Sequence, residues 1–510
     1  MTRHTTLSAA IALVLTSSAA LAGNVADIYQ DGEDNFADIT QINSDEPMTA
    51  IISTVGDGNS AVVLQNNSWF VEATITQEGD SNNANIVQED FSDDSTATIN
   101  QVFGTTGSTA SILQTAADES VASITQEGAL SSTASISQSN TLAATGTITQ
   151  IGESNQASIV NLNSWYTEAS ILQSGSDLVA SISQTNVSDD SIARIVQFGA
   201  GNMADVVQDG AYLSQATVTQ LGDSNTASVL QLNVEEVSAD ILQTGDGNEA
   251  VITQTDGAFN SSASIVQSGD GNAATIDQLN AASDSSAFVD QSGDDNLANV
   301  IQGGEFDFAS ISQSGDVNSA WIDQSFGADN QAYIDQSGSD NIADIQQIAS
   351  FDGYADIVQT GDTNDAYISQ EGDFNSAVIN QSGEGNLAEI DQLGADNIAT
   401  VDQAGNSNIA DIDQWGELND ALISQAGSYN DAVIFQDGSD NIAEIDQSGD
   451  YNIAEIVQEG IGNDALISQS GIGTADAPNQ AYITQIGDGH LATITQAGGG
   501  GNYANIYQSN

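Results

Sequence analysis

The chain has 510 residues, among them 72 Asp and Glu, two Arg and Lys, two His, two Pro and no Cys. A formal net charge of −70 excludes a protein that binds the phosphate backbone of nucleic acids, because such a protein needs clustered basic residues. The absence of Cys excludes thiol nucleophiles, disulfide bonds and Cys-ligated zinc.

Residues 1–22 are predicted to be a secretory signal peptide. Arg3 gives a short cationic start, an apolar stretch follows, and Ala20-Leu21-Ala22 forms the small-x-small cleavage site, so that the mature chain begins at Gly23. The alternative interpretation is a buried N-terminal helix. No later stretch approaches 18 uninterrupted apolar residues, so we expect no membrane-spanning helix and an exported protein.

A repeat of about eleven residues fills residues 23–510. The unit that begins at Gln436 reads Gln-x-Gly-x-x-Asn-x-Ala-x-Ile-x-Gln and ends on Gln447. About 42 such units lie between Gln30 and Gln508, at a mean spacing of about 11.7 residues, and the spacing is eleven throughout residues 359–469. One repeated unit therefore accounts for the chain better than several globular domains.

Three residues of this repeat are predicted to have structural roles. The glutamines predicted to stack as a ladder are Gln359, Gln370, Gln381, Gln392, Gln403, Gln414, Gln425, Gln436, Gln447, Gln458 and Gln469. The asparagines predicted to do the same are Asn364, Asn375, Asn386, Asn397, Asn408, Asn419, Asn430, Asn441, Asn452 and Asn463. The glycines predicted to lie in the connecting arcs are Gly361, Gly372, Gly383, Gly394, Gly405, Gly416, Gly427, Gly438, Gly449 and Gly460.

The repeat predicts strands rather than helices. An eleven-residue period also fits a right-handed helical supercoil, but Asn-x-Ala-x-Ile-x-Gln alternates with a period of two and a glycine punctuates each full unit. We expect strands of about seven residues joined by x-Gly-x-x arcs that reverse the chain. In part of the chain only every second unit keeps the Gly and Asn, which indicates a structural period of two units.

These features predict an all-β fold, a β-solenoid with cross-β stacking. It has about 21 turns, each made of two short strands joined by Gly-containing arcs, and no caps. Ala faces Ile and Asn faces Gln across the two strands of a turn, and identical residues stack at ~4.8 Å from turn to turn. The buried amides then pair with their own kind in the next turn, which offsets the cost of burying them. Both prolines, Pro47 and Pro478, are expected in arcs.

The remaining candidate residues have simple structural interpretations. His490 occupies an Asn position, which favours a ladder substitution over a catalytic or metal role, and Arg194 is expected to point outward. Gly-Asp-Gly-Asn stretches at 245–248 and 269–272 resemble calcium loops but lack the loop spacing and terminal Glu of calcium-binding motifs. Four tryptophans are expected in arcs or outward positions, with surface adhesion as the functional alternative: Trp69, Trp165, Trp321 and Trp415.

The carboxylates are expected on outward positions, stacked from turn to turn. Examples are Asp411, Asp413, Glu444, Asp446 and Glu455. No cofactor is predicted, only diffuse screening of these acids by Na⁺ or Ca²⁺. The carboxylates are too numerous and too regular for one pair to indicate a catalytic dyad.

The repeat resembles the curlin repeat of curli fibre subunits, which are bacterial functional amyloids. Gln267-Ser-Gly-Asp-Gly-Asn-Ala-Ala-Thr-Ile-Asp-Gln278 fits that motif at every position, and Ile445-Asp-Gln-Ser-Gly-Asp-Tyr-Asn-Ile-Ala454 is most similar to the minor, nucleating subunit. The chain departs from the family in having about four times the usual number of repeats. It also lacks a Gly/Asn-rich export segment, since Asn24 already fits a repeat.

The resemblance implies a non-enzymatic structural subunit of an extracellular curli-like fibre on the surface of a Gram-negative-type bacterium. Its expected roles are biofilm matrix formation and cell adhesion by self-templated polymerisation. The implied partners are the chain itself, other curlin-type subunits and an outer-membrane export system. The absence of caps supports end-to-end addition. The alternatives are a monomeric cell-surface adhesin or ligand-binding solenoid, and more remotely an enzyme acting on matrix polysaccharide.

Overall fold

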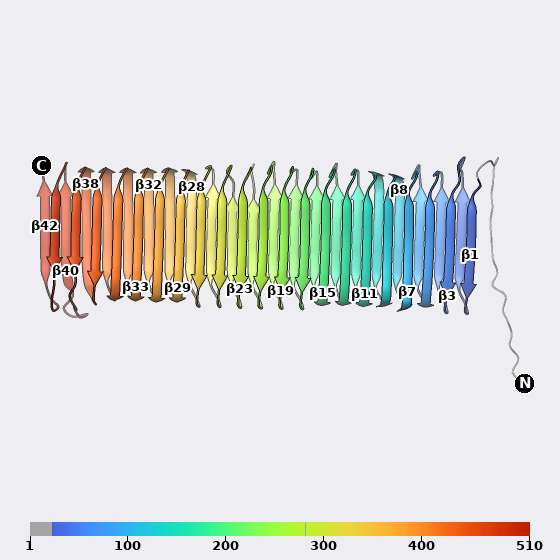
Figure 1. The fold of residues 1–510 in the computed structure, drawn as a ribbon, viewed down its shortest axis with the longest axis horizontal. Helices are drawn as coiled ribbons and strands as arrows, with labels where there is room; N and C mark the ends of the chain where they lie inside the picture. Colours follow the sequence, from blue (N-terminus) through green and yellow to red (C-terminus); the bar gives the residue numbers. More distant parts are fainter. Residues whose placement is uncertain (1–22, 281) are drawn as a thin grey trace, which may run out of the picture. The chain divides into compact units, whose positions relative to one another are not determined.

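A computed structural model describes residues 23–280 and 282–510, and the predicted signal peptide lies outside this part of the chain. The chain divides into two compact units, Met1–Asp256 and Gly257–Asn510. Every regular element in the described residues is a β-strand (Figure 1). No helix among those residues has the length and apolar character needed to cross a bilayer.

The first unit contains 20 strands in two layers, which alternate along the chain. The odd-numbered strands are β1 (Val25–Asp31), β3 (Thr49–Val55), β5 (Glu72–Asp80), β7 (Thr96–Thr106), β9 (Val121–Leu130), β11 (Thr145–Glu153), β13 (Glu168–Ser176), β15 (Ile192–Ala200), β17 (Gln215–Leu221) and β19 (Ser238–Thr244). The even-numbered strands are β2 (Phe36–Ile42), β4 (Ser60–Asn66), β6 (Asn83–Glu89), β8 (Thr109–Asp118), β10 (Thr133–Leu142), β12 (Gln156–Leu162), β14 (Val179–Thr185), β16 (Met203–Asp209), β18 (Thr226–Leu232) and β20 (Glu249–Thr255).

The second unit contains 22 strands in the same arrangement. Its odd-numbered strands are β21 (Ser262–Ser268), β23 (Ser286–Ser292), β25 (Phe308–Ser314), β27 (Gln331–Ser337), β29 (Tyr354–Asp362), β31 (Ser376–Glu384), β33 (Ile398–Asn406), β35 (Asp420–Ser428), β37 (Ile442–Ser448), β39 (Asp464–Gln469) and β41 (Leu491–Gln496). Its even-numbered strands are β22 (Ala273–Gln278), β24 (Leu297–Gln302), β26 (Ser319–Ser325), β28 (Ile342–Phe351), β30 (Asp365–Asp373), β32 (Leu387–Ala395), β34 (Ile409–Glu417), β36 (Asp431–Ser439), β38 (Asn452–Ile461), β40 (Asn479–Ile486) and β42 (Tyr503–Ser509).

Strands pair in parallel and in register with the next strand but one. Between β31 and β33, for example, Ala377 lies beside Ala399 and Gln381 beside Gln403. One odd and one even strand therefore make one turn of a β-solenoid, which gives ten turns in the first unit and eleven in the second. The predicted fold class, an all-β solenoid of about 21 turns, is confirmed.

The core of each unit lies between its two layers and is built from the alternating inward positions. In the interior turns the Ala and Ile of each repeat, or Val in place of Ile, are buried, and so are the Asn and Gln that flank them, whereas the corresponding residues of β1 and β42 are partly or fully exposed. Gly146 occupies an Ala position of β11, and a Cβ there would lie 3.0 Å from Cγ2 of Ile136 on the facing strand β10. At this turn a small residue thus faces a large one, which keeps the width of the core constant.

The strands are longer than the predicted seven residues in much of the second unit. In β29–β36 each strand has nine residues and continues through the glycine and one residue beyond it. Gly383 accordingly pairs with Gly405 of the next turn. The expectation that this glycine lies in the reversal was wrong for these strands, because without a Cβ the backbones stay close enough to remain paired. The reversal itself uses two residues, such as Gly385 and Asn386 between β31 and β32.

Both prolines lie between strands, as predicted. Pro47 precedes β3, and Pro478 ends a connection of nine residues, 470–478, between β39 and β40. Within that connection Thr474 and Ala477 form an antiparallel bridge. The extra residues do not shift the stack, because Gln458 still donates a hydrogen bond to Gln485 and Gln469 still donates one to Gln496.

Candidate functional site

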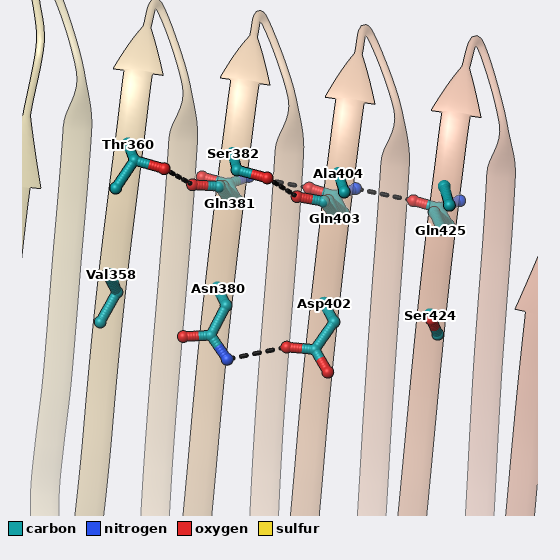
Figure 2. Close-up of a pocket in the computed structure, with 11 residues that line it drawn as sticks. Val358, Thr360, Asn380, Gln381, Ser382, Asp402, Gln403, Ala404, Ser424 and Gln425 are labelled. Carbon is teal, nitrogen blue, oxygen red and sulfur yellow. Dashed lines mark hydrogen bonds between the residues drawn. The ribbon is translucent and has the colours of Figure 1, made fainter.

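The repeated glutamines form ladders of hydrogen bonds within each layer. In the odd strands the Nε2 of Gln381 donates to Oε1 of Gln403 at 2.9 Å, and Gln403 donates to Gln425 at 2.8 Å (Figure 2). The same Nε2 of Gln381 also donates to the backbone oxygen of Asp365 on the facing strand, at 2.9 Å. Each glutamine thus joins consecutive turns and also ties the two layers together.

All eleven glutamines singled out from the sequence lie in these ladders. Their hydrogen bonds to the next turn are 2.8–3.0 Å long, and each donates toward the C-terminal turn. A buried amide hydrogen bond contributes about 0.5–1.5 kcal/mol, whereas an unpaired buried amide costs about 1–3 kcal/mol. Interruption of a ladder therefore lowers the stability by more than one lost hydrogen bond, because it also leaves buried amide groups unpaired.

The asparagines form a second pair of ladders whose hydrogen bonds run in the opposite direction. Asn386 donates from both its backbone nitrogen and its Nδ2 to Oδ1 of Asn364 in the preceding turn, at 3.1 and 3.0 Å. Its Nδ2 also donates to the carbonyl of Gly405 in the following turn, at 2.9 Å. In nine of the ten predicted asparagines the backbone nitrogen donates to Oδ1 of an asparagine in the turn before, which for Asn364 is Asn341. The exception is Asn375, whose Nδ2 donates to the carbonyl oxygen of Gly394 in the following turn. The opposed directions of the two ladders were not visible in the sequence.

The ten predicted glycines lie where consecutive turns approach most closely. All have φ between +105° and +132°, a region that favours glycine. A Cβ at Gly383 would lie 2.0 Å from the carbonyl oxygen of Gly405, and the other nine positions give 1.9–2.3 Å. Both the backbone conformation and the close approach therefore exclude a side chain.

The residue just before each ladder asparagine adopts a left-handed conformation, which the sequence analysis missed. Leu418, Tyr429 and Asp440 have φ of 57°, 58° and 54°, and Gly462 has φ of 68°. Non-glycine residues pay about 1–2 kcal/mol for this conformation. No single residue type marks the position, so only its constant place in the repeat would have identified it.

Two substitutions interrupt the glutamine ladders of the first unit. Thr54 lies in register between Gln30 and Gln77, and the Nε2 of Gln30, the Oγ1 of Thr54 and the Oε1 of Gln77 have no hydrogen-bond partner. Asn161 keeps a bond to Gln184 at 2.6 Å, but its Oδ1 is buried without a partner. The threonine is too short to reach either neighbour.

Asp307 stands in an asparagine position of the second unit and is buried, with 1% of its surface exposed. Its Oδ1 accepts bonds from the backbone nitrogen and Nδ2 of Asn330, at 3.0 and 3.1 Å, as a ladder asparagine would. Its Oδ2 is buried without a partner. A Cβ built at Gly304 would lie 2.5 Å from this Oδ2 and 2.3 Å from the carbonyl oxygen of Gly327.

Oδ2 of Asp307 thus lies where a ladder asparagine would have its Nδ2, which is a hydrogen-bond donor. In the next turn the equivalent atom is Nδ2 of Asn330, which donates to the carbonyl of Ser350 at 2.7 Å. Burial, and to a smaller degree the charge of Asp329, raise the pKa of Asp307 from its ordinary 3.8 to about 6, while the bonds from Asn330 and a contact with the backbone of Gly304 oppose this rise. Protonation of Oδ2 would supply the missing donor. Asp307 was not among the residues predicted from the sequence, although it follows Gln302 by the spacing that marks the Asn of other repeats.

Only part of the predicted stacking of carboxylates is present. Asp411 and Asp413 lie in register with Glu389 and Asp391 of the preceding turn. Burial, and then the charge of Asp413 and the other acids, raise the pKa of Asp411 to about 6. The pKa of Glu389 is also raised, first by burial and then by Asp391.

The other three acids named from the sequence do not stack on acids. Glu444 lies between Leu422 and Leu466, and Asp446 lies between two serines. Glu455 lies between Val433 and Tyr482. Our expectation of stacked acids was wrong here because the positions that stack on these three residues, in the turns before and after, hold Leu, Ser, Val or Tyr instead of Asp or Glu. All three do point outward.

His490 and Arg194 lie where the sequence placed them. The backbone nitrogen of His490 donates to Oδ1 of Asn463 at 3.1 Å, as an asparagine in this position would, and its ring contacts the carbonyl of Ile486. Arg194 is exposed on β15, in register with Ser170 and Thr217.

The Gly-Asp-Gly-Asn stretches are explained by the conformation of the arcs. Gly245 and Gly269 are the close-approach glycines, with φ of 103° and 104°, and Gly247 and Gly271 fill the left-handed position. Among the described residues no three His, Asp or Glu side chains are placed to hold a metal ion. Trp165, Trp321 and Trp415 are exposed and Trp69 is half-buried, in arcs or on the outer faces of strands.

Comparison with known proteins identifies the repeat. The family model of the curlin associated repeat matches residues 259–293, 293–325, 352–383, 383–416, 405–438, 416–449, 438–471 and 478–498. These eight matches all lie in the second unit. Among curated proteins none has a sequence that matches this chain.

Proposed function

Because the chain belongs to the curlin-repeat family, we propose that it is a structural subunit of an extracellular curli-like amyloid fibre. In this role it forms biofilm matrix and mediates cell adhesion by self-templated polymerisation. Its partners are further copies of itself, other curlin-type subunits and an outer-membrane export system of a Gram-negative-type bacterium. This role involves no catalysis and no cofactor; Na⁺ or Ca²⁺ act only by screening its acids.

The parallel, in-register stack is the observation that supports this proposal. Gln403 bonds to Gln425 in the same way that Gln381 bonds to Gln403, so each turn makes the same contacts with the next. An outer turn of such a stack presents backbone groups and amides in the arrangement that a further turn requires. A turn from another copy satisfies those groups as well as a turn from the same chain does.

Purified mature chain, incubated at neutral pH and examined by negative-stain microscopy, tests the proposal. We expect unbranched fibres, and fibre diffraction with reflections near ~4.8 Å along the axis and ~10 Å across it. Preformed fibres added to fresh chain should shorten the lag before polymerisation. Monodisperse particles that persist for days would refute the proposal and favour the alternative, a monomeric cell-surface adhesin.

A further inference from the structure

Two tyrosines lie one above the other on consecutive turns of the second unit. Tyr429 and Tyr451 each occupy the left-handed position just before a ladder asparagine, with φ of 58° and 55°. Their rings are stacked, with centroids 4.8 Å apart and planes inclined by 12°. The backbone fixes this arrangement, because Asn430 and Asn452, the residues that follow them, bond to each other within one ladder.

The pair is accessible from solvent. Tyr429 is 54% exposed and Tyr451 is half-buried. Both line a shallow groove of about 250 Å³ whose other apolar walls include Ile409, Ile453 and Pro478. Pro478 belongs to the nine-residue connection that follows β39. A small oxidant can therefore reach both phenols, while the ladder below them holds the rings together.

We propose that Tyr429 and Tyr451 are a site of oxidative cross-linking, at which hydrogen peroxide and a haem peroxidase join them as dityrosine. The cross-link joins two consecutive turns covalently, in a chain that has no cysteine with which to form a disulfide. This inference is independent of the proposed fibre function, since it requires only the folded turns.

The reaction balances as a two-electron oxidation. Each phenol loses one electron and one proton and becomes a tyrosyl radical. The two radicals couple through the ring carbons ortho to the oxygens, one carbon–carbon bond forms, and each ring regains aromaticity as its ortho hydrogen moves to the phenolic oxygen. The peroxide oxygen–oxygen bond breaks, and one H₂O₂ is reduced to two H₂O. Coupling of two radicals held side by side competes well against encounters between chains because it needs no diffusion.

The other tyrosine pairs of the second unit are less well arranged. The rings of Tyr333 and Tyr354 have centroids 5.9 Å apart and planes inclined by 44°, and those of Tyr482 and Tyr503 are 5.8 Å apart at 44°. Tyr354 also donates a hydrogen bond to Asp356, which holds its phenol. We therefore expect the pair at 429 and 451 to react first.

Treatment of the dilute full-length mature chain with hydrogen peroxide and a haem peroxidase tests the proposal. We expect dityrosine fluorescence on a species that keeps the mass of a single chain. Since the chain offers trypsin almost no sites, digestion uses a protease that cleaves after acidic residues. The expected product is one peptide pair containing residues 429 and 451, lighter by two hydrogens than the sum of the two peptides.

Single variants locate the reaction. Tyr429→Phe and Tyr451→Phe keep the stacked rings but should each lose most of the fluorescence, whereas the matched change Tyr354→Phe should lose little. Equal losses in all three variants would overturn the proposal. So would cross-links that join isotopically labelled to unlabelled chains in a mixture, because they would show coupling between copies rather than between turns.

Discussion

Replacement of Asp307 by Asn should stabilise the second unit in a manner that depends on pH. The folded-state pKa of about 6 lies above the ordinary 3.8, so the unfolded chain ionises first as pH rises. The protonated carboxyl makes its full contribution to the free energy of unfolding below about pH 4. This contribution falls as pH rises from about 4 to about 6 and is absent at higher pH. The rise in pKa corresponds to about 3 kcal/mol. The amide introduced by Asp307→Asn keeps its donor at every pH, so the variant should match the wild type near pH 4 and exceed it by about 3 kcal/mol at pH 7.

Hydrogen–deuterium exchange of the peptides that contain β25 and β27 measures this local effect, because repeat stacks open locally. At pH 7 the variant's amides should exchange about 100-fold more slowly than those of the wild type, and near pH 4 the two should agree after correction for intrinsic rates. The exposed neighbour Asp329 provides a control of equal charge: its charge helps raise the pKa of Asp307, so Asp329→Asn should give a smaller protection at pH 7, because it leaves Oδ2 of Asp307 unpaired. Equal protection by both variants, or protection by Asp307→Asn that does not change with pH, would refute the assigned role of Oδ2.

Five further substitutions, two of them controls, and one assembly experiment test the remaining contacts. Thr54→Gln should complete the interrupted ladder and stabilise the first unit by about 1–3 kcal/mol in urea denaturation, and an unchanged midpoint would mean that the gap holds water. Gly460→Ala should prevent stable folding, since its Cβ would lie 2.1 Å from a carbonyl oxygen, whereas Gly462→Ala two residues later, in the reversal that follows β38, should cost only about 1–2 kcal/mol. Similar circular dichroism melts of the two variants would contradict the close approach. Ala443→Ile should cost about 1–3 kcal/mol by overpacking the core, while Glu444→Ile on the outer face should be nearly neutral, and equal losses would refute the alternation. At pH 7 the lag before thioflavin-positive fibres form should shorten as NaCl rises from about 10 mM to about 500 mM, because the screening length falls to roughly 4–5 Å. A lag that ignores salt would mean that the net charge of −70 does not oppose assembly.

The fold was predictable because the local and the long-range signals of this chain agree. The two-residue alternation around Ala443 and Ile445 predicted which residues are buried, and both are. The alternate loss of the glycine and asparagine indicated two units for each turn, and the pairing of Gln381 with Gln403 has that spacing. Such agreement is expected where one short motif must satisfy identical neighbours in every turn.

The unpredicted features depend on geometry rather than on residue type. Leu418, Tyr429 and Asp440 share a left-handed conformation but no chemistry, so the position carries no sequence signal of its own. The direction of each amide ladder depends on how the side chains rotate. Asp307 was predictable in principle from its place after Gln302, yet its effect depends on the burial of one oxygen beside a carbonyl.

The nine-residue connection 470–478 shows that an arc can lengthen while the strands on either side keep their partners. For the gene, this means that codons added at an arc, or duplicated in blocks that encode a whole turn, leave the flanking contacts intact, because each turn touches only its neighbours. Chain length can therefore change between generations without a new fold having to evolve. The same tolerance makes this arc a place to graft a foreign peptide, which would project from the edge of a layer while the ladders beneath it stay in register.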